Sequence, residues 1–191
     1  MMTRFRAVLA VLAALAVVVA GCSSGSESPP PAAPPPTIDL DPSTMESFAG
    51  PYPVVAVLPG LVVQLDRGRE GGITTVGLLG AVAADERHCF GAEAAAEAHR
   101  LLDGQRVRVV GDPGLGRTDA EGRPLAYVWL QSGRMANELL VEGGFAREAA
   151  GVEPYAYRSA FARSEELARI DGRGLWAAGS CNGNVAKPAS Q

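Results

Sequence analysis

The chain has 191 residues, of which 47% are hydrophobic and 20% charged, and 17 Lys and Arg against 21 Asp and Glu give a formal net charge of −4. This length leaves room for one domain of ordinary size beside any targeting segment. The acidic balance argues against a nucleic-acid-binding protein that depends on long-range attraction to phosphates.

The N-terminus carries the pattern of a bacterial export signal. Arg4 and Arg6 precede an apolar run over residues 7–20, which is shorter than the roughly 20 residues of a membrane span. The run ends in Val-Ala-Gly-Cys, which resembles the lipobox of bacterial lipoproteins, where the cysteine receives a lipid; a cysteine without lipid is the alternative. We therefore expect a signal peptide over residues 1–21, a lipid on Cys22 and a secreted protein on the extracytoplasmic face of the cell membrane.

A spacer follows the predicted anchor. Residues 22–40 are rich in Pro and Ser, a composition that buries little apolar area and favours extended polyproline conformations. Loss of residues 1–21 removes two Arg and no acid, so that 15 Lys and Arg face 21 Asp and Glu, a formal −6. The predicted organisation is a linker over 22–40, one folded domain over 41–181 and a flexible tail over 182–191.

The folded part begins with strands. Residues 54–58, 61–65 and 73–79 are rich in β-branched side chains and are separated by Pro59-Gly60 and Gly71-Gly72, which predicts consecutive antiparallel strands. Two further strands are predicted over 106–110 and 125–130.

Helices alternate with the later strands. Residues 91–104 contain helix formers throughout, with Ala94, Ala98, Leu101 and Leu102 at helical spacing, and end at a glycine. Two more helices are predicted over 134–141 and 155–170. Five short strands, a helix after the third and two helices after the fifth predict an α+β fold, a Greek-key β-barrel of the OB type.

Two cysteines remain once Cys22 is assigned to lipid. Cys89 and Cys181 would enter an oxidising compartment, where such a pair forms a disulfide; two free thiols are the alternative. The bridge would close a loop of about 90 residues, which the loop-entropy model values at roughly 4 kcal/mol.

Several sequence words in this order resemble one known family. "HCFGAEA", "DAEGRPLAYVWL", "NELLVEGGFA" and "YRSAFARSEELARIDGRGLW" are similar to words of the staphylococcal nuclease-like (thermonuclease) family, over residues 55–181. The resemblance implies a five-stranded OB barrel with three helices. In active members, calcium held by aspartates binds the scissile phosphate, two arginines neutralise it, and a glutamate positions or activates the attacking water.

Only part of that machinery has counterparts here. The family's "D-x-x-G-R" word places an arginine at Arg123, with Asp119 at its head. Asp85 falls where the glutamate is expected, or Glu86 after a shift of one residue. The early metal aspartate has a doubtful counterpart in Asp66, because the family's Asp-Gly-Asp-Thr word is absent.

Two other positions lack the expected charge. The family's first arginine falls on Gly77 and its metal-binding aspartate on Val82, neither of which can bind phosphate or metal through its side chain. Loss of one preorganised electrostatic partner costs about 10²–10³ in rate, and calcium requires six to eight oxygen ligands. The resemblance therefore implies a non-catalytic binding module without a cofactor. The alternatives are a calcium-dependent extracellular nuclease acting on DNA or RNA through Arg123 and Asp85, and an envelope scaffold whose protein partner the sequence does not identify.

Overall fold

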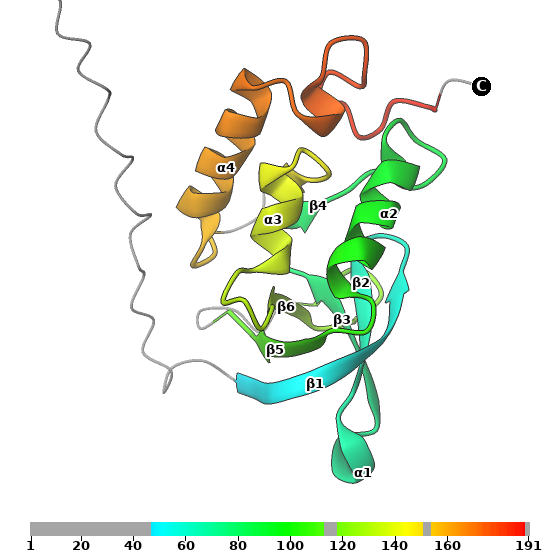
Figure 1. The fold of residues 1–191 in the computed structure, drawn as a ribbon, viewed down its shortest axis with the longest axis vertical. Coiled ribbons are helices and arrows are strands. Elements are labelled where there is room, and N and C mark those ends of the chain that lie inside the picture. Colours follow the sequence, from blue (N-terminus) through cyan, green and yellow to red (C-terminus); the bar gives the residue numbers. More distant parts are fainter. Residues whose placement is uncertain (1–46, 113–117, 151–153, 190–191) are drawn as a thin grey trace, which may run out of the picture. The chain divides into compact units, whose positions relative to one another are not determined.

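The computed structural model describes residues 47–112, 118–150 and 154–189. Five strands form a closed barrel in the order β1, β2, β3, β6, β5, and a separate two-stranded sheet joins β4 to β7. The predicted OB-type barrel with three main helices, α2, α3 and α4, is confirmed (Figure 1). In chain order the elements are β1 (Ser47–Leu58), β2 (Val62–Asp66), α1 (Gly68–Gly71), β3 (Ile73–Leu78), β4 (Ala81–Val82), α2 (Gly91–Leu102), β5 (Arg106–Val110), β6 (Leu125–Trp129), α3 (Ala136–Glu142), β7 (Arg147–Glu148), α4 (Arg158–Ile170) and the 3-10 helix η2 (Gly174–Trp176).

The first three strands form a meander, as the sequence predicts. β1 pairs with β2 and β2 with β3, both antiparallel, and the β2–β3 register sets Val62 opposite Gly77 and Asp66 opposite Ile73. The barrel closes through the antiparallel pairs β1–β5 and β5–β6 and the parallel pair β3–β6. Gly77 therefore lies inside the sheet, with β2 on one side and β6 on the other.

β1 is longer than the sequence predicts. It begins at Ser47, although Pro51 and Pro53 interrupt the β-branched pattern before Val54. The register with β5 shifts between Phe48 and Tyr52, and such irregularities accommodate prolines that cannot donate a ladder hydrogen bond.

Branched aliphatic residues and a few aromatics fill the core. Val63, Val76, Val109 and Tyr127 of the barrel are completely buried, and Phe161 of α4 packs in the same cluster. Helix α2 buries Ala94, Ala98 and Leu102 on one face, which confirms the predicted periodicity.

One buried amide fixes helix α3 to the barrel next to the predicted site. The Asn137 side chain accepts a hydrogen bond from the Val128 amide at 2.9 Å and donates to the carbonyls of Leu79 and Ala126 at 2.9 and 3.0 Å. These three bonds satisfy buried polar groups of the side chain and of the backbone around it. They hold the chain just after β3 against β6.

The C-terminal segment, over which the sequence predicts a flexible tail from residue 182, makes backbone contacts with the loop before α2. Cys89 N donates to Lys187 O at 2.7 Å, Ala189 N donates to Arg87 O at 3.1 Å, and His88 forms a bridge with Pro188. We call residues 180–189 the C-terminal strap. It lies along the loop that leads into α2.

Other predictions concern residues outside the described part of the chain. The signal peptide over 1–21, Cys22, the linker over 22–40 and the first residues of the predicted domain all lie there. Within the described part, no helix is both long and apolar enough to cross a membrane.

Candidate functional site

Gly77 lies at the point where the family's first arginine is expected, and a neighbouring side chain occupies its space. Its amide donates to Pro124 O at 2.9 Å. A Cβ added to Gly77 would lie 2.7 Å from Cδ2 of Leu125 and 3.5 Å from Oδ2 of Asp119. The Leu125 side chain would therefore have to shift to admit any side chain at position 77, and the turn that contains Asp119 lies directly beside Gly77.

Arg123 is held by two carboxylates of its own turn. Its Nε donates to Asp119 Oδ2 at 2.6 Å and its Nη2 to Glu121 Oε2 at 2.9 Å. Asp119 Oδ1 also accepts the amides of Glu121 and Arg123, at 3.0 and 2.9 Å. The Arg123 side chain is 35% exposed, so this ion pairing occurs at a partly solvated surface. The guanidinium is thus paired within the turn before any phosphate approaches.

The electrostatics of Asp119 are consistent with this pairing. Burial alone would raise the pKa of Asp119, but the hydrogen bonds from the Arg123 side chain and amide outweigh it and lower the pKa. The carboxylate is charged at neutral pH and offsets the charge of Arg123. The sequence pattern identifies Asp119 and Arg123, whereas the contribution of Glu121 is visible only from the contact.

Val82, at the position of the family's metal-binding aspartate, belongs to the small β4–β7 sheet. It lies opposite Arg147 in the β4–β7 pair and is 44% exposed. The charges of β7 have partners from α4 and the segment before it: Glu148 accepts the Tyr155 hydroxyl at 2.7 Å and pairs with Arg158 at 3.4 Å. Burial, followed by the hydrogen bond to Glu148, raises the pKa of Tyr155, which therefore stays neutral.

Asp85 is an exposed carboxylate bound to its own loop. Its Oδ1 accepts the side-chain Nε and the amide of Arg87, both at 2.9 Å. The side-chain hydrogen bond, followed by the amide, lowers the pKa of Asp85 to about 2. Such a weakly basic carboxylate is poorly suited to accept a proton near neutral pH. Glu86, the alternative by a shift of one residue, is also exposed and lines a small cavity.

That cavity lies between the turn before β2, the loop after β4 and helix α2, and holds about 20 Å³. A water molecule needs about 10–15 Å³, so the cavity admits little more than one. Its walls are mostly apolar, and Glu86 and His99 are its titratable side chains; the lining residues are Val57, Leu58, Pro59, Gly60, Leu61, Ala83, Ala84, Glu86, Gly91, Ala95, Ala98 and His99.

Asp66 lies away from the other predicted site residues. It pairs with Ile73 at the far end of the β2–β3 hairpin, whereas Gly77 pairs with Val62. Four residues of strand correspond to about 13 Å. The carboxylate accepts the Gly68 amide at 2.8 Å and so terminates β2 locally. The structure brings Gly77, Asp119 and Arg123 together and leaves Asp66 outside that group.

The side chains present do not fit a calcium ion. Among the residues that the structure describes, no group of three or more His, Cys, Asp or Glu is arranged to hold a metal. Asp85 and Asp66 are committed to Arg87 and Gly68, and Val82 supplies no side-chain oxygen. This donor set falls short of the six to eight oxygens that calcium requires.

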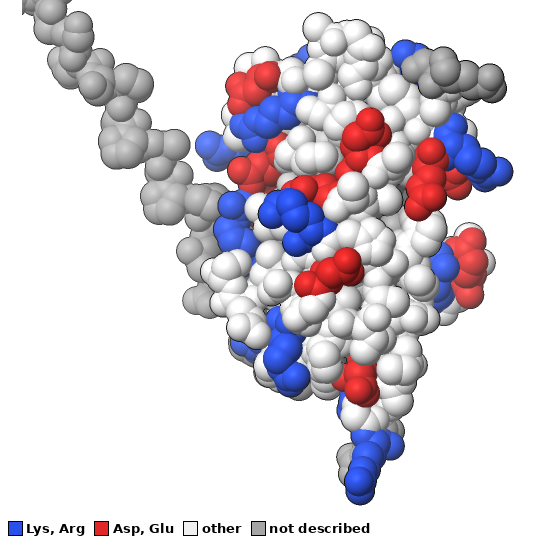
Figure 2. Space-filling view, turned by 45° about the vertical axis from the view of Figure 1, so that its right-hand side comes forward, with Lys and Arg blue, Asp and Glu red and all other residues white. Residues whose placement is uncertain are grey.

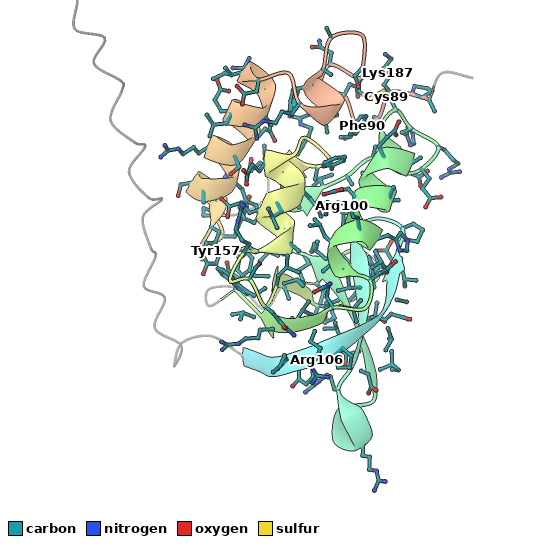
Figure 3. All side chains as sticks on the ribbon, in the orientation of Figure 1. Cys89, Phe90, Arg100, Arg106, Tyr157 and Lys187 are labelled. Atoms are coloured by element: carbon teal, nitrogen blue, oxygen red, sulfur yellow. A yellow bond between two sulfur atoms is a disulfide. The ribbon has the colours of Figure 1, made fainter. Side chains whose placement is uncertain are left out.

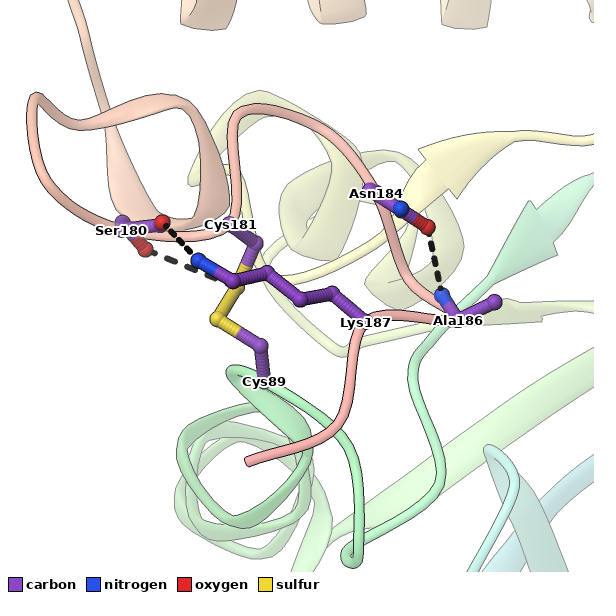
Figure 4. Close-up of a disulfide and its surroundings, with 6 residues drawn as sticks. All are labelled: Cys89, Ser180, Cys181, Asn184, Ala186 and Lys187. Carbon is purple, nitrogen blue, oxygen red and sulfur yellow. Dashed lines mark hydrogen bonds between the residues drawn. A yellow bond between two sulfur atoms is a disulfide. The ribbon is translucent and has the colours of Figure 1, made fainter. Parts of the chain in front are cut away.

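The predicted disulfide is confirmed. The sulfur atoms of Cys89 and Cys181 are bonded at 2.03 Å across a sequence separation of 92 residues. Figure 4 shows Lys187 beside this bridge, and its Nζ donates to Ser180 O at 3.1 Å. The bridge joins the start of α2 to the C-terminal strap.

The comparisons identify one family. The model for the staphylococcal nuclease homologue family matches residues 76–178, more than half of the chain. The match begins within β3, so β1 and β2 lie outside it, although the structure includes both strands in the barrel. No curated protein matches the chain.

Proposed function

Because the chain belongs to the staphylococcal nuclease homologue family, we propose that it is a catalytically silent member, tethered outside the cell by lipid on Cys22 and acting as a binding module. We infer that the chain keeps the barrel of the family but lacks its phosphate-binding arginine pair and its metal site.

The observation that carries the proposal is the state of the arginine pair. Arg123 is paired with Asp119 and Glu121, and at Gly77, the position of the family's first arginine, the Leu125 side chain lies where a Cβ would be. Phosphodiester hydrolysis concentrates negative charge on the phosphoryl oxygens, so fixed cations lower the barrier. One pre-paired arginine beside two acids supplies little net positive charge for that purpose.

The remaining parts support the same proposal. Loss of a single electrostatic partner costs about 10²–10³ in rate, or roughly 3–4 kcal/mol. Here one arginine and one metal ligand are missing together, at Gly77 and Val82. The Asp85 carboxylate, with its low pKa, is a weak base toward water.

The membrane tether rests on the sequence of the N-terminus. Val19-Ala-Gly-Cys22 supports lipidation, and the Pro-rich linker over residues 22–40 would hold the domain away from the bilayer. A bilayer is then the first partner of the chain, and no cofactor is needed.

A nuclease assay with calcium tests catalytic silence. We expect no cleavage of single- or double-stranded DNA or RNA above background in millimolar calcium. We also expect no rise in melting temperature on adding calcium, because only a ligand that binds the folded state stabilises it. Magnesium at the same ionic strength controls for general salt effects.

A positive result would select the alternative function. Cleavage that calcium switches on and that Arg123→Gln abolishes would establish a calcium-dependent extracellular nuclease and overturn catalytic silence. Cleavage that survives Arg123→Gln would instead point to a contaminating nuclease.

A further inference from the structure

An open hollow lies between the first half of β1 and the turn end of the β2–β3 hairpin, where Asp66 and Arg67 lead into α1. It has a volume of about 440 Å³, within the usual 300–1,000 Å³ of small-ligand sites. Figure 3 places Arg106 in this region, next to the stalk that leads to α1. The lining side chains are those of Pro51, Tyr52, Pro53, Asp66, Arg67 and Arg106.

Two arginines of the hollow come from separate elements. Arg106 begins β5, and its Nη2 donates to Pro51 O at 2.7 Å. Arg67 follows β2, and its guanidinium carbon lies 5.8 Å from the centroid of the Tyr52 ring. Both side chains are therefore oriented by protein contacts, which reduces the entropy lost on binding a ligand.

The segments at this end of the fold carry more basic than acidic residues in the sequence: Arg67, Arg69, Arg106 and Arg108 against Asp66 and Glu70. Arg69 of α1 and Arg108 of β5, each two residues beyond a lining arginine, are exposed. Figure 2 shows basic side chains over α1 and its surroundings, with an acidic side chain among them. Asp66 is the acidic side chain of the lining. The chain as a whole is acidic, so this cluster is a local feature and not a product of net charge.

The lining has the chemistry for a phosphate and for a carbon skeleton that bears hydroxyls. Guanidinium groups bind phosphate oxygens through paired, charge-assisted hydrogen bonds. The flanking prolines and the part of the Tyr52 ring that Arg67 does not cover offer an apolar surface for the face of a sugar or polyol. The Asp66 carboxylate can accept hydroxyl protons, and its negative charge opposes a densely charged polyanion.

We propose that this hollow binds a phosphate ester of a sugar or polyol, either free or as the headgroup of a lipid. The phosphate lies between Arg67 and Arg106, and the hydroxylated carbons lie over Tyr52 beside Asp66. The site deepens the proposed binding role and rests on it, and it is separate from the turn that contains Arg123.

Titrations of the full chain with Cys22→Ala, folded with its disulfide, test the site. The probes are glycerol 1-phosphate, glucose 6-phosphate, inorganic phosphate and glucose. Isothermal titration calorimetry measures the binding of each. We expect the phosphate esters to bind more tightly than inorganic phosphate, and glucose to bind far more weakly than its phosphate. Arg67→Gln and Arg106→Gln should each weaken ester binding about tenfold or more, since each removes a charged hydrogen-bond donor.

A matched variant separates this site from a general loss of charge. Arg163→Gln removes one positive charge from an exposed position on α4 and should change the affinity less than twofold. Equal weakening by all three variants, or no weakening by any of them, would overturn the proposal, as would the absence of ester binding to the parent chain.

Amide shift mapping on the parent chain covers the case in which a variant misfolds. Glucose 6-phosphate should shift the amides of Tyr52, Arg67, Gly68 and Arg106. Shifts confined to residues 118–123 would move the ligand to the Arg123 turn and contradict this site. Because the nuclease assay uses a different readout, catalytic silence and the hollow can fail independently.

Vesicles distinguish the two sources of the phosphate. Binding of the Cys22→Ala chain to phosphatidylglycerol vesicles, but not to phosphatidylcholine vesicles, with loss in Arg106→Gln, identifies a lipid headgroup. Binding of the soluble esters without any vesicle binding identifies a free ligand.

Discussion

Arg123 illustrates how one side chain can keep its place in a motif while its chemical environment changes. Asp119 holds its Nε and Glu121 holds its Nη2, and Leu125 occupies the volume that a side chain at position 77 would need. Asp85 is likewise bound by Arg87, two residues along its own loop. Arg123 and Asp85 are thus each paired with charged groups of their own turn or loop.

The pairing of Asp85 with Arg87 predicts a measurable titration. Carbon-detected NMR should give a midpoint near pH 2 for the Asp85 carboxyl, and Arg87→Gln should raise it toward the ordinary value of about 3.9. The depressed pKa means that any stability from the pair is fully present above about pH 4 and is lost as the pH falls toward 2. The difference in unfolding midpoint between parent and variant should therefore shrink over that range.

His88 allows a control for this titration. His88 Nδ1 lies 3.8 Å from Asp85 Oδ1, and His88→Gln should move the Asp85 midpoint less than Arg87→Gln does. The reverse order would show that Arg87 is not the main cause of the low pKa.

Restoring an arginine at position 77 should destabilise the fold. In Gly77→Arg the new Cβ meets Leu125 at 2.7 Å, and such overpacking costs about 1–3 kcal/mol in free energy of unfolding. Leu125→Ala in the same chain should reduce the cost of the added arginine, giving a favourable coupling energy in a double-mutant cycle by urea denaturation.

Val55→Arg provides the matched comparison for that cycle. Val55 lies in β1 and is 50% exposed, so the same side chain should be accommodated there with little change. If Gly77→Arg proved as harmless as Val55→Arg, Leu125 would not block the position.

The strands and helices follow local sequence patterns where those patterns are complete. The β-branched run at 106–110 matches β5, and the periodic apolar face of 91–104 matches α2. The first part of β1 is not predictable in this way, because its prolines are untypical of a strand and lie next to a shift in register with β5. The β4–β7 pair joins two-residue segments that are far apart in the sequence, so no local pattern indicates it.

For the candidate site, too, local sequence indicates some residues, and long-range contacts determine the others. The resemblance to the family's D-x-x-G-R word suggests Arg123 with Asp119 at its head, and the structure places both residues in a single turn. The roles of Leu125 and Glu121, and the distance of Asp66 from Gly77, depend on strand register and side-chain contacts. Those are properties of the folded barrel and not of a sequence window.

We expect the Cys89–Cys181 disulfide to stabilise the fold and to hold the C-terminal strap in place. Cys89→Ser with Cys181→Ser should lower the free energy of unfolding by about 2–5 kcal/mol, measured by urea denaturation. The Ala189 amide donates to Arg87 O across the strap, and in the double variant it should lose protection from hydrogen exchange. Reductant should reproduce the loss in the parent and leave the double variant unchanged; equal stability of parent and variant would contradict the prediction.

The whole chain combines an acidic domain with a predicted lipid at one end. A formal charge of −6 after removal of residues 1–21 gives no general attraction to anionic surfaces. The proposed retention at the membrane therefore rests on the predicted lipid on Cys22, with the proposed Arg67–Arg106 hollow as a local addition.

Cell fractionation tests that dependence. Cys22→Ala should move the protein from the membrane fraction to the soluble fraction or leave the signal peptide uncleaved, because the acyl chains are the main anchor. Ser23→Ala, beside the processed position, should leave the distribution unchanged. A Cys22→Ala chain that is correctly cleaved and still sediments with membranes would rule out the lipid anchor.

The parallel pairing of β3 with β6 also sets an order of events during synthesis. The β1–β2–β3 meander can form once residue 78 is available, but the outer edge of β1 waits for β5 and that of β3 waits for β6. Until Leu125 emerges, the nascent chain therefore exposes two unpaired strand edges, which are the sites at which unfinished β-sheets associate with one another. Premature termination anywhere between β3 and β6 would yield a fragment prone to aggregation, and not a smaller working domain.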